Sequence, residues 1–208
     1  MGEKIFDKVV ELSADLLEPA WDEIFKDPIL KDVPVLGTAV KAASLVQGIS
    51  DRLFFIKITR FLEALDRESR AKAKEFAGEI QCGNEDANRV AETLLLAIDK
   101  IDDLQKAPVL AAIFASFLRG EMSKADLRRL IFAVNSAAVD DILTLASIGL
   151  DPSGRSKECT DALTALQHTG LSQAGVEFVV TEKDADISDM ITPLGQKFLS
   201  AAAGIRSK

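Results

Sequence analysis

Apolar side chains recur three or four positions apart along most of the chain, and this spacing is typical of amphipathic helices. Over residues 3–26 the apolar stripe faces a line of acidic side chains, so an amphipathic helix bent near Pro19 is expected there. The same period predicts further helices over residues 50–77, 84–101, 108–119, 123–134, 137–147, 157–169 and 193–199. The pattern therefore indicates a mainly α protein built as a multi-helix bundle.

Capping residues mark where several of these helices begin and end. Ser50 is expected to cap one long helix that continues to about Ala77, and residues 78–84 are expected to form a loop. Side chains suited to capping stand before three later helices, and glycines follow two of them; these residues are Asn84, Ser123, Thr192, Gly120 and Gly170. The element boundaries are thus predicted mostly by local signals.

Residues 34–49 form the most apolar stretch of the chain and include several small side chains. A helix that is apolar on nearly all sides is typical of a protein core, which is the interpretation we favour. An interface between copies of the chain and contact with a membrane are the alternatives. The stretch is shorter than the roughly 20 residues that span a bilayer, and Lys41 lies near its middle.

The last quarter of the chain changes character. Residues 176–181 form the one run with clear β pattern, and residues 190–192 are expected to pair with it across an acidic loop. Thr192 and Pro193 then suit the start of a final helix. From Ser123 onward the expected order is helix, helix, helix, strand, acidic loop, strand, helix.

This order resembles a winged-helix module, and two short motifs resemble the end of its third helix and the exit from its wing. The motifs are Ala162-Leu163-x-x-Leu166-x-x-x-Gly170-Leu171 and Ile191-Thr192-Pro193-Leu194-Gly195. The resemblance implies a helical bundle with a C-terminal winged-helix-like β-hairpin. Together with the helical pattern upstream, it predicts a helical bundle over residues 1–121 and a winged-helix-like module packed on it over residues 122–208, with one continuous domain as the alternative.

In DNA-binding members of that class, the third helix and the wing carry cationic side chains. Here the matching helix has no arginine after Arg155, and the wing carries Glu182, Asp184 and Asp186 against a single lysine, Lys183. Carboxylates beside a phosphate backbone would oppose binding. We therefore expect the module, and these three acidic residues, to contact a protein instead.

The overall charge and the cysteine usage argue against nucleic-acid binding, a disulfide and a zinc site. The 33 acidic and 25 basic residues give a net charge of −8, which repels nucleic acid and anionic lipid. Cys82 and Cys159 are far apart and have no neighbouring Cys or His, so neither a disulfide nor a zinc site is expected. A cytoplasmic location fits this cysteine usage, and the first residues lack the pattern of a signal peptide.

No residue pattern indicates catalysis, a cofactor or a metal. His168 is the one histidine of the chain, and no serine or cysteine stands in a suitable pattern beside it. Three aspartates, Asp99, Asp102 and Asp103, are expected to lie on a solvated helix face that also carries Lys100 and Lys106. The sequence therefore predicts that the protein is not an enzyme.

Residues 50–76 carry an excess of positive charge in this acidic protein. The favoured interpretation is a solvated face that pairs with the acidic N-terminal helix, and the alternative is a docking patch for an acidic partner or phosphate. The residues that would form such a patch are Arg52, Lys57, Arg60 and Arg67.

Residues 99–106, followed by Phe114, Phe117, Leu118, Gly120 and Ser123, resemble helical accessory proteins of bacteria, some of them from prophages or defence loci. The resemblance implies a regulatory or interaction role. Our hypothesis is a non-enzymatic factor that binds another protein or itself, in bacterial or prophage defence or conflict. The alternatives are a membrane-acting effector that uses residues 28–56 and a DNA-binding transcriptional regulator.

Overall fold

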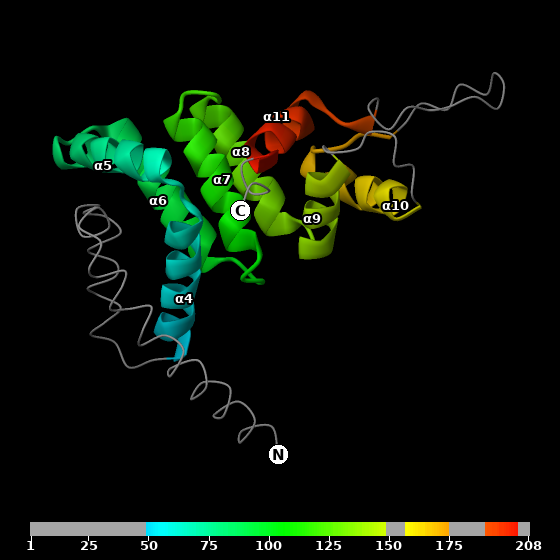
Figure 1. Cartoon of the computed structure of the whole chain (residues 1–208), viewed down its shortest axis with the longest axis horizontal. Coiled ribbons are helices and arrows are strands. Elements are labelled where there is room, and N and C mark those ends of the chain that lie inside the picture. The colour runs from blue at the N-terminus through cyan, green and yellow to red at the C-terminus, as the bar shows by residue number, and fades with distance from the viewer. Residues whose placement is uncertain (1–48, 149–156, 175–189, 204–208) are drawn as a thin grey trace, which may run out of the picture.

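A computed structural model describes residues 49–148, 157–174 and 190–203, and most of these residues are helical. The helices are α4 (Ile49–Ala64), α5 (Arg67–Gln81), α6 (Glu85–Asp99), α7 (Lys106–Leu118), α8 (Lys124–Ser136), α9 (Val139–Ile148), α10 (Lys157–Ala165) and α11 (Pro193–Ala202), and the 3-10 turn η1 (Leu166–Thr169) follows α10 (Figure 1). The mainly α fold class is confirmed. None of the described helices combines the length and apolar character that a membrane crossing requires.

Helix α7 forms the centre of the bundle. In Figure 1, α4 and α5 lie on one side of it and α9 and α10 on the other, and α7 itself contacts α4, α5, α8 and α11. Its sequence, KAPVLAAIFASFL, is apolar on almost every side, which suits a helix that neighbours surround. Pro108 lies in its first turn, where no intrahelical N–H bond is lost.

Around α7 the buried side chains form one continuous hydrophobic cluster. The cluster extends from Ile58 in α4 to Ala202 in α11, and it therefore crosses the position near residue 121 where two domains were expected to meet. Phe114 lies at its aromatic centre, with ring centroids 6.0 Å from Phe61, 5.8 Å from Phe76 and 6.2 Å from Phe117. These contacts hold α4 and α5 against the central helix.

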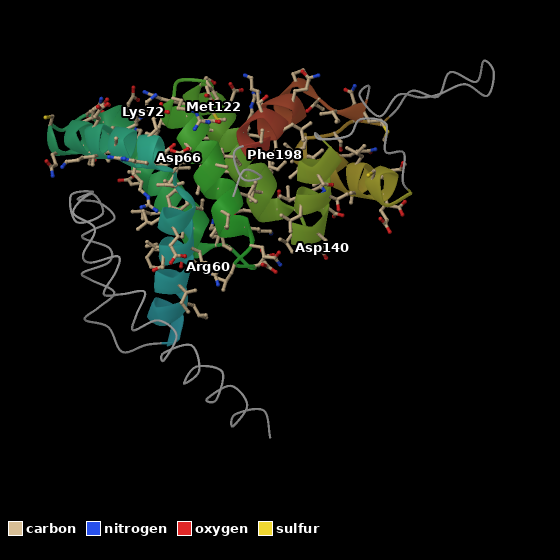
Figure 2. All side chains as sticks on the ribbon, viewed as in Figure 1. Arg60, Asp66, Lys72, Met122, Asp140 and Phe198 are labelled. Atoms are coloured by element: carbon tan, nitrogen blue, oxygen red, sulfur yellow. The ribbon has the colours of Figure 1, made fainter. Side chains whose placement is uncertain are left out.

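The prediction of one long helix from Ser50 to about Ala77 is wrong, because the chain turns between α4 and α5 (Figure 2). Asp66 has extended backbone, and its side chain accepts a hydrogen bond of 2.7 Å from the Ser69 N–H. The Arg70 side chain donates to the carbonyl of Leu65 at 2.9 Å. Side-chain bonds to the backbone thus replace helical bonds at the corner, although neither glycine nor proline marks it.

Most of the expected helix ends are confirmed. Asn84, Ser123 and Thr192 cap α6, α8 and α11, and Ser123 forms a capping box with Asp126. Gly120 and Gly170 have positive φ angles of 78° and 76°, which end their helices. The loop predicted over residues 78–84 is shorter than expected, because α5 continues through Gly78 to Gln81.

The expected β-hairpin is not seen among the described residues. Its first strand, residues 176–181, lies outside them, as do residues 34–48 of the apolar stretch, whose last residue, Ile49, begins α4. Ile191 instead forms an isolated antiparallel bridge with Ser172. The Gln173 N–H donates to the Met190 carbonyl at 2.8 Å, and the Thr192 N–H donates to the Leu171 carbonyl at 3.1 Å.

Candidate interaction site

The basic residues predicted to bind a partner differ in their surroundings. Lys57 donates from Nζ to the Asp99 carbonyl at 2.6 Å, so its charge caps the C-terminal end of α6. Arg60 on α4 and Arg67 at the start of α5 are exposed, and Arg52 lies in the first turn of α4. Lys57 therefore has a structural role, and docking by the other three stays a prediction.

Two further cations of the basic segment are also engaged locally. Arg70 donates to carbonyls at the end of α4, and Lys72 lies 3.3 Å from Glu68 within α5. Glu182, Asp184 and Asp186 lie outside the described residues. The structure therefore does not bring the predicted basic and acidic residues together into one described site.

A groove opens between α8, the end of η1 and the start of α11. Its volume is about 610 Å³. The described residues that line it are Arg128, Arg129, Phe132, Thr169, Gly170, Thr192, Pro193 and Leu194. Two cations and an aromatic ring therefore stand on one wall, and an apolar helix start forms the other.

The aromatic ring of Phe132 faces the solvent. Its side chain is 64 % exposed, although α8 buries Leu127, Leu130 and Val134 on its core face. Residues 128 and 132 are one helical turn apart, so the Arg128 side chain lies next to the ring on the outer face of α8. Helix α8 is thus apolar toward the core and also carries an aromatic group outward.

The two arginines of the groove have no ion-pair partner among the residues that the structure describes. Neighbouring lysines are paired, since Lys124 lies 2.6 Å from Asp86 and Lys197 lies 2.5 Å from Asp126. The pKa of Asp86 is lowered, first by its hydrogen bond with Lys124 and only weakly by the more distant charge of Arg128. None of the described residues that line the groove is acidic, and both arginine side chains are exposed.

Hydrogen bonds fix the floor of the groove. The Thr192 hydroxyl donates toward the Gly170 carbonyl at 2.6 Å and accepts from the Gly195 N–H at 3.0 Å. His168 contacts the Ala165 carbonyl at 2.7 Å through Nδ1 and the Ser136 carbonyl at 3.2 Å through Nε2. These bonds connect the start of α11, η1 and the end of α8.

A second, smaller hollow lies between α5, α6 and α7 and has a volume of about 280 Å³. Its rim carries both signs of charge, with Glu75, Glu79 and Asp86 beside Lys72 and Lys124. Because Lys124 and Asp86 already form an ion pair, this hollow offers less unmatched charge than the groove does.

The prediction that Lys106 lies on a solvated face with the aspartates is wrong. Its side chain is fully buried, and its Nζ lies 2.6 Å from Oδ1 of Asp102. The Lys106 hydrogen bond is the main cause that lowers the pKa of Asp102. Burial follows because Lys106 stands in the first turn of α7, which neighbouring helices enclose.

The described residues contain no cluster of His, Cys, Asp and Glu side chains that could hold a metal ion. His168 is exposed at the end of η1. Cys82 is exposed and Cys159 is half-buried.

The sequence pattern does not predict the groove or its three main residues, Arg128, Arg129 and Phe132. One signal was present, because Phe132 stands out of phase with the apolar positions Leu127 and Leu130 of the same helix. The contribution of α11 to the groove depends on tertiary packing and has no local signal. Comparison with known proteins finds no matching family model, no matching curated protein and no matching solved structure.

Proposed function

We propose that this chain is a non-enzymatic interaction or regulatory factor that works by binding another protein or a second copy of itself. The observation that carries the proposal is the ring of Phe132, 64 % exposed in a groove beside two arginines without ion-pair partners among the described residues. Aromatic and arginine side chains are enriched where proteins bind one another. Phe132 adjoins Pro193 and Leu194 along the groove, and exposed apolar groups that adjoin in this way are typical of a surface that a partner covers.

The proposed setting is the bacterial cytoplasm, in prophage or host defence or conflict. It rests on the resemblance of residues 99–123 to bacterial accessory proteins and on the cysteine usage of the chain.

We also propose that residues 122–208 form a winged-helix-like module with a C-terminal hairpin. The order of α8, α9 and α10, the bridge between Ser172 and Ile191, and α11 supports this fold. Nuclear magnetic resonance assignment of the full chain tests it. Strand-type chemical shifts and cross-strand contacts over residues 176–181 are expected, and helical shifts there would contradict the module.

Affinity purification from the cells that carry the gene tests the proposed function. The full chain is tagged and expressed at its natural level, and recovered proteins are quantified by mass spectrometry against a tag-only control. We expect a partner protein in an amount comparable with that of the chain, or a self-associated chain in sedimentation. Recovery of neither, together with retardation of DNA fragments or flotation with liposomes, would contradict the proposal.

A further inference from the structure

We infer that the groove between α8 and α11 binds an acidic peptide segment that carries an apolar anchor side chain. Carboxylates of the segment pair with Arg128 and Arg129, and the anchor packs against Phe132 and Leu194. This inference rests on the proposed function, because it names the chemistry of the partner at that site.

Charge complementarity selects the acidic partner. The groove contains two guanidinium groups, and none of the described residues that line it is acidic, within a protein whose net charge is −8. A guanidinium group binds a carboxylate through two parallel hydrogen bonds, which gives both energy and direction. A basic partner would find no acidic group among the lining residues and would meet two positive charges.

The apolar half of the groove selects an anchor side chain. Phe132 stands on the α8 wall, and Pro193 and Leu194 stand on the α11 wall. A side chain inserted between these walls removes apolar surface of both from water, which favours binding. An acidic segment without an apolar anchor side chain is therefore expected to bind more weakly than one whose carboxylates flank such a side chain.

The size of the groove limits the partner to a short segment at this site. A volume of about 610 Å³ holds a few side chains. Its walls are fixed before binding, because Lys197 of α11 lies 2.5 Å from Asp126 of α8 and Thr192 bonds to Gly170. A preformed groove costs little conformational entropy when the segment binds.

Nucleic acid fits the groove less well than an acidic peptide does. Phosphate contacts give useful affinity only when many cations act together, and here two arginines act against a net charge of −8.

Selection from a displayed library of random 12-residue peptides on the full-length chain tests the inference. We expect enriched peptides in which Asp or Glu flank an aromatic or aliphatic residue. Labelled copies of these peptides are then titrated by fluorescence anisotropy against the Arg128→Glu/Arg129→Glu variant and against Phe132→Ser. Each change is expected to weaken binding at least tenfold.

Two matched controls separate the groove from general surface effects. Arg89→Glu reverses an exposed charge on α6, and Leu96→Ser removes an apolar side chain that is 61 % exposed on the same helix. Both variants are expected to bind the selected peptides as the unmodified chain does. Circular dichroism and thermal unfolding confirm that all variants are folded before binding is compared.

Several results would overturn the inference. These are enrichment of basic or purely apolar peptides, no enrichment at all, and acidic peptides that bind the groove variants unchanged. If the chain binds a 20-nucleotide single-stranded DNA and Arg128→Glu/Arg129→Glu abolishes this binding, the ligand of the groove is nucleic acid and the inference is wrong. A dimer in sedimentation that Phe132→Ser dissociates, without peptide selection, would replace it with a second copy.

Peptide binding at the groove and recovery of a natural partner are measured separately, so either can fail without the other. If the Arg128→Glu/Arg129→Glu variant still recovers the natural partner from cells, the interaction role stands and the groove is not its site. If peptides require the groove but no natural partner or self-association is found, the peptide chemistry stands and the proposed role is wrong.

Discussion

At the scale of single residues, two charged side chains show how the fold uses ion pairs. Lys106 is fully buried, and the carboxylate of Asp102 is the ion-pair partner that the described residues give it. Asp126 caps α8 by accepting from the Ser123 N–H at 3.3 Å, and it also contacts Lys197 of α11. The first pair places a charge in an apolar surrounding, whereas the second connects two helices near the surface.

Replacing Lys106 with methionine is expected to leave the free energy of unfolding unchanged or to raise it by about 1 kcal/mol. Burial removes the hydration of the ammonium group, and its attraction to one carboxylate offsets little more than this loss. The variant Asp102→Asn keeps the buried ammonium group and removes its charged partner, so its free energy of unfolding is expected to be lower by about 1–2 kcal/mol. Urea unfolding of both variants and of the double variant measures this contrast. A loss in Lys106→Met as large as that in Asp102→Asn would contradict it.

Asp126 makes stability depend on pH in the acid range. Its pKa is lowered from 3.8 to about 2, first by the hydrogen bond from Lys197 and then by that from Ser123. Because the folded pKa lies below the unfolded one, the carboxylate stabilises the fold above about pH 4, and this stabilisation is lost as the pH falls toward 2.

We expect Asp126→Asn to lower the free energy of unfolding by about 1 kcal/mol at pH 7, since the exposed lysine partner is screened by salt. The difference from the unmodified chain should be roughly halved at pH 3. Urea unfolding at pH 7, 5, 4 and 3 measures it. Glu92→Gln, at an exposed position of α6, is the control and should show no such trend. An unchanged difference at pH 3 would exclude this role for Asp126.

At the scale of elements, α11 lies unusually close to the chain segment before it. A Cβ atom placed on Gly195 would lie 2.1 Å from the Leu171 carbonyl oxygen and 2.8 Å from Cγ2 of Ile191. Glycine at this position therefore permits the docking of α11, which completes one wall of the groove. The backbone oxygen cannot move away cheaply, because Leu171 also accepts a hydrogen bond from the Thr192 N–H.

Gly195→Ala is expected to destabilise the protein by about 1–3 kcal/mol, the usual cost of overpacking. Gly78→Ala is the matched control. Gly78 lies within α5, and nothing stands within 4 Å of an added Cβ. That change should instead stabilise by about 0.5–1 kcal/mol, because alanine favours helix. Thermal unfolding of the two variants checks these opposite signs. Equal effects would show that the contact with Leu171 does not determine the docking of α11.

At the scale of the whole molecule, a single hydrophobic cluster joins helices from both halves of the chain. Phe61 of α4 and Phe198 of α11 are both fully buried in it, and α7 contacts both helices. A shared core of this kind makes the halves depend on each other, because exposing one surface of α7 removes contacts from the other helices.

We therefore expect Phe61→Ala and Phe198→Ala each to lower the free energy of unfolding by about 3–5 kcal/mol. Each change should move one unfolding transition that all the described helices share. Circular dichroism in urea follows the helices, and hydrogen exchange with mass spectrometry follows α4 and α11 separately. Both probes should give the same midpoint in each variant. Separate midpoints before and after residue 121 would support the two-domain division instead.

The sequence by itself determined the helical class and most helix boundaries of the described residues. These features are local, since a cap such as Asn84 or Ser123 and a stop such as Gly120 bond within a few residues of themselves. The apolar spacing and the capping residues therefore suffice to predict a helix whose ends depend only on nearby residues.

Only the tertiary structure decided the corner at Asp66, the burial of Lys106 and the groove at Phe132. The corner depends on side-chain bonds to backbone that compete with a continuous helix, and burial depends on which neighbours enclose a helix face. The groove needs α8 and α11, which are far apart in the sequence, to stand side by side. The sequence could show that Phe132 is out of phase, but only the packing shows the arginines and apolar wall beside it.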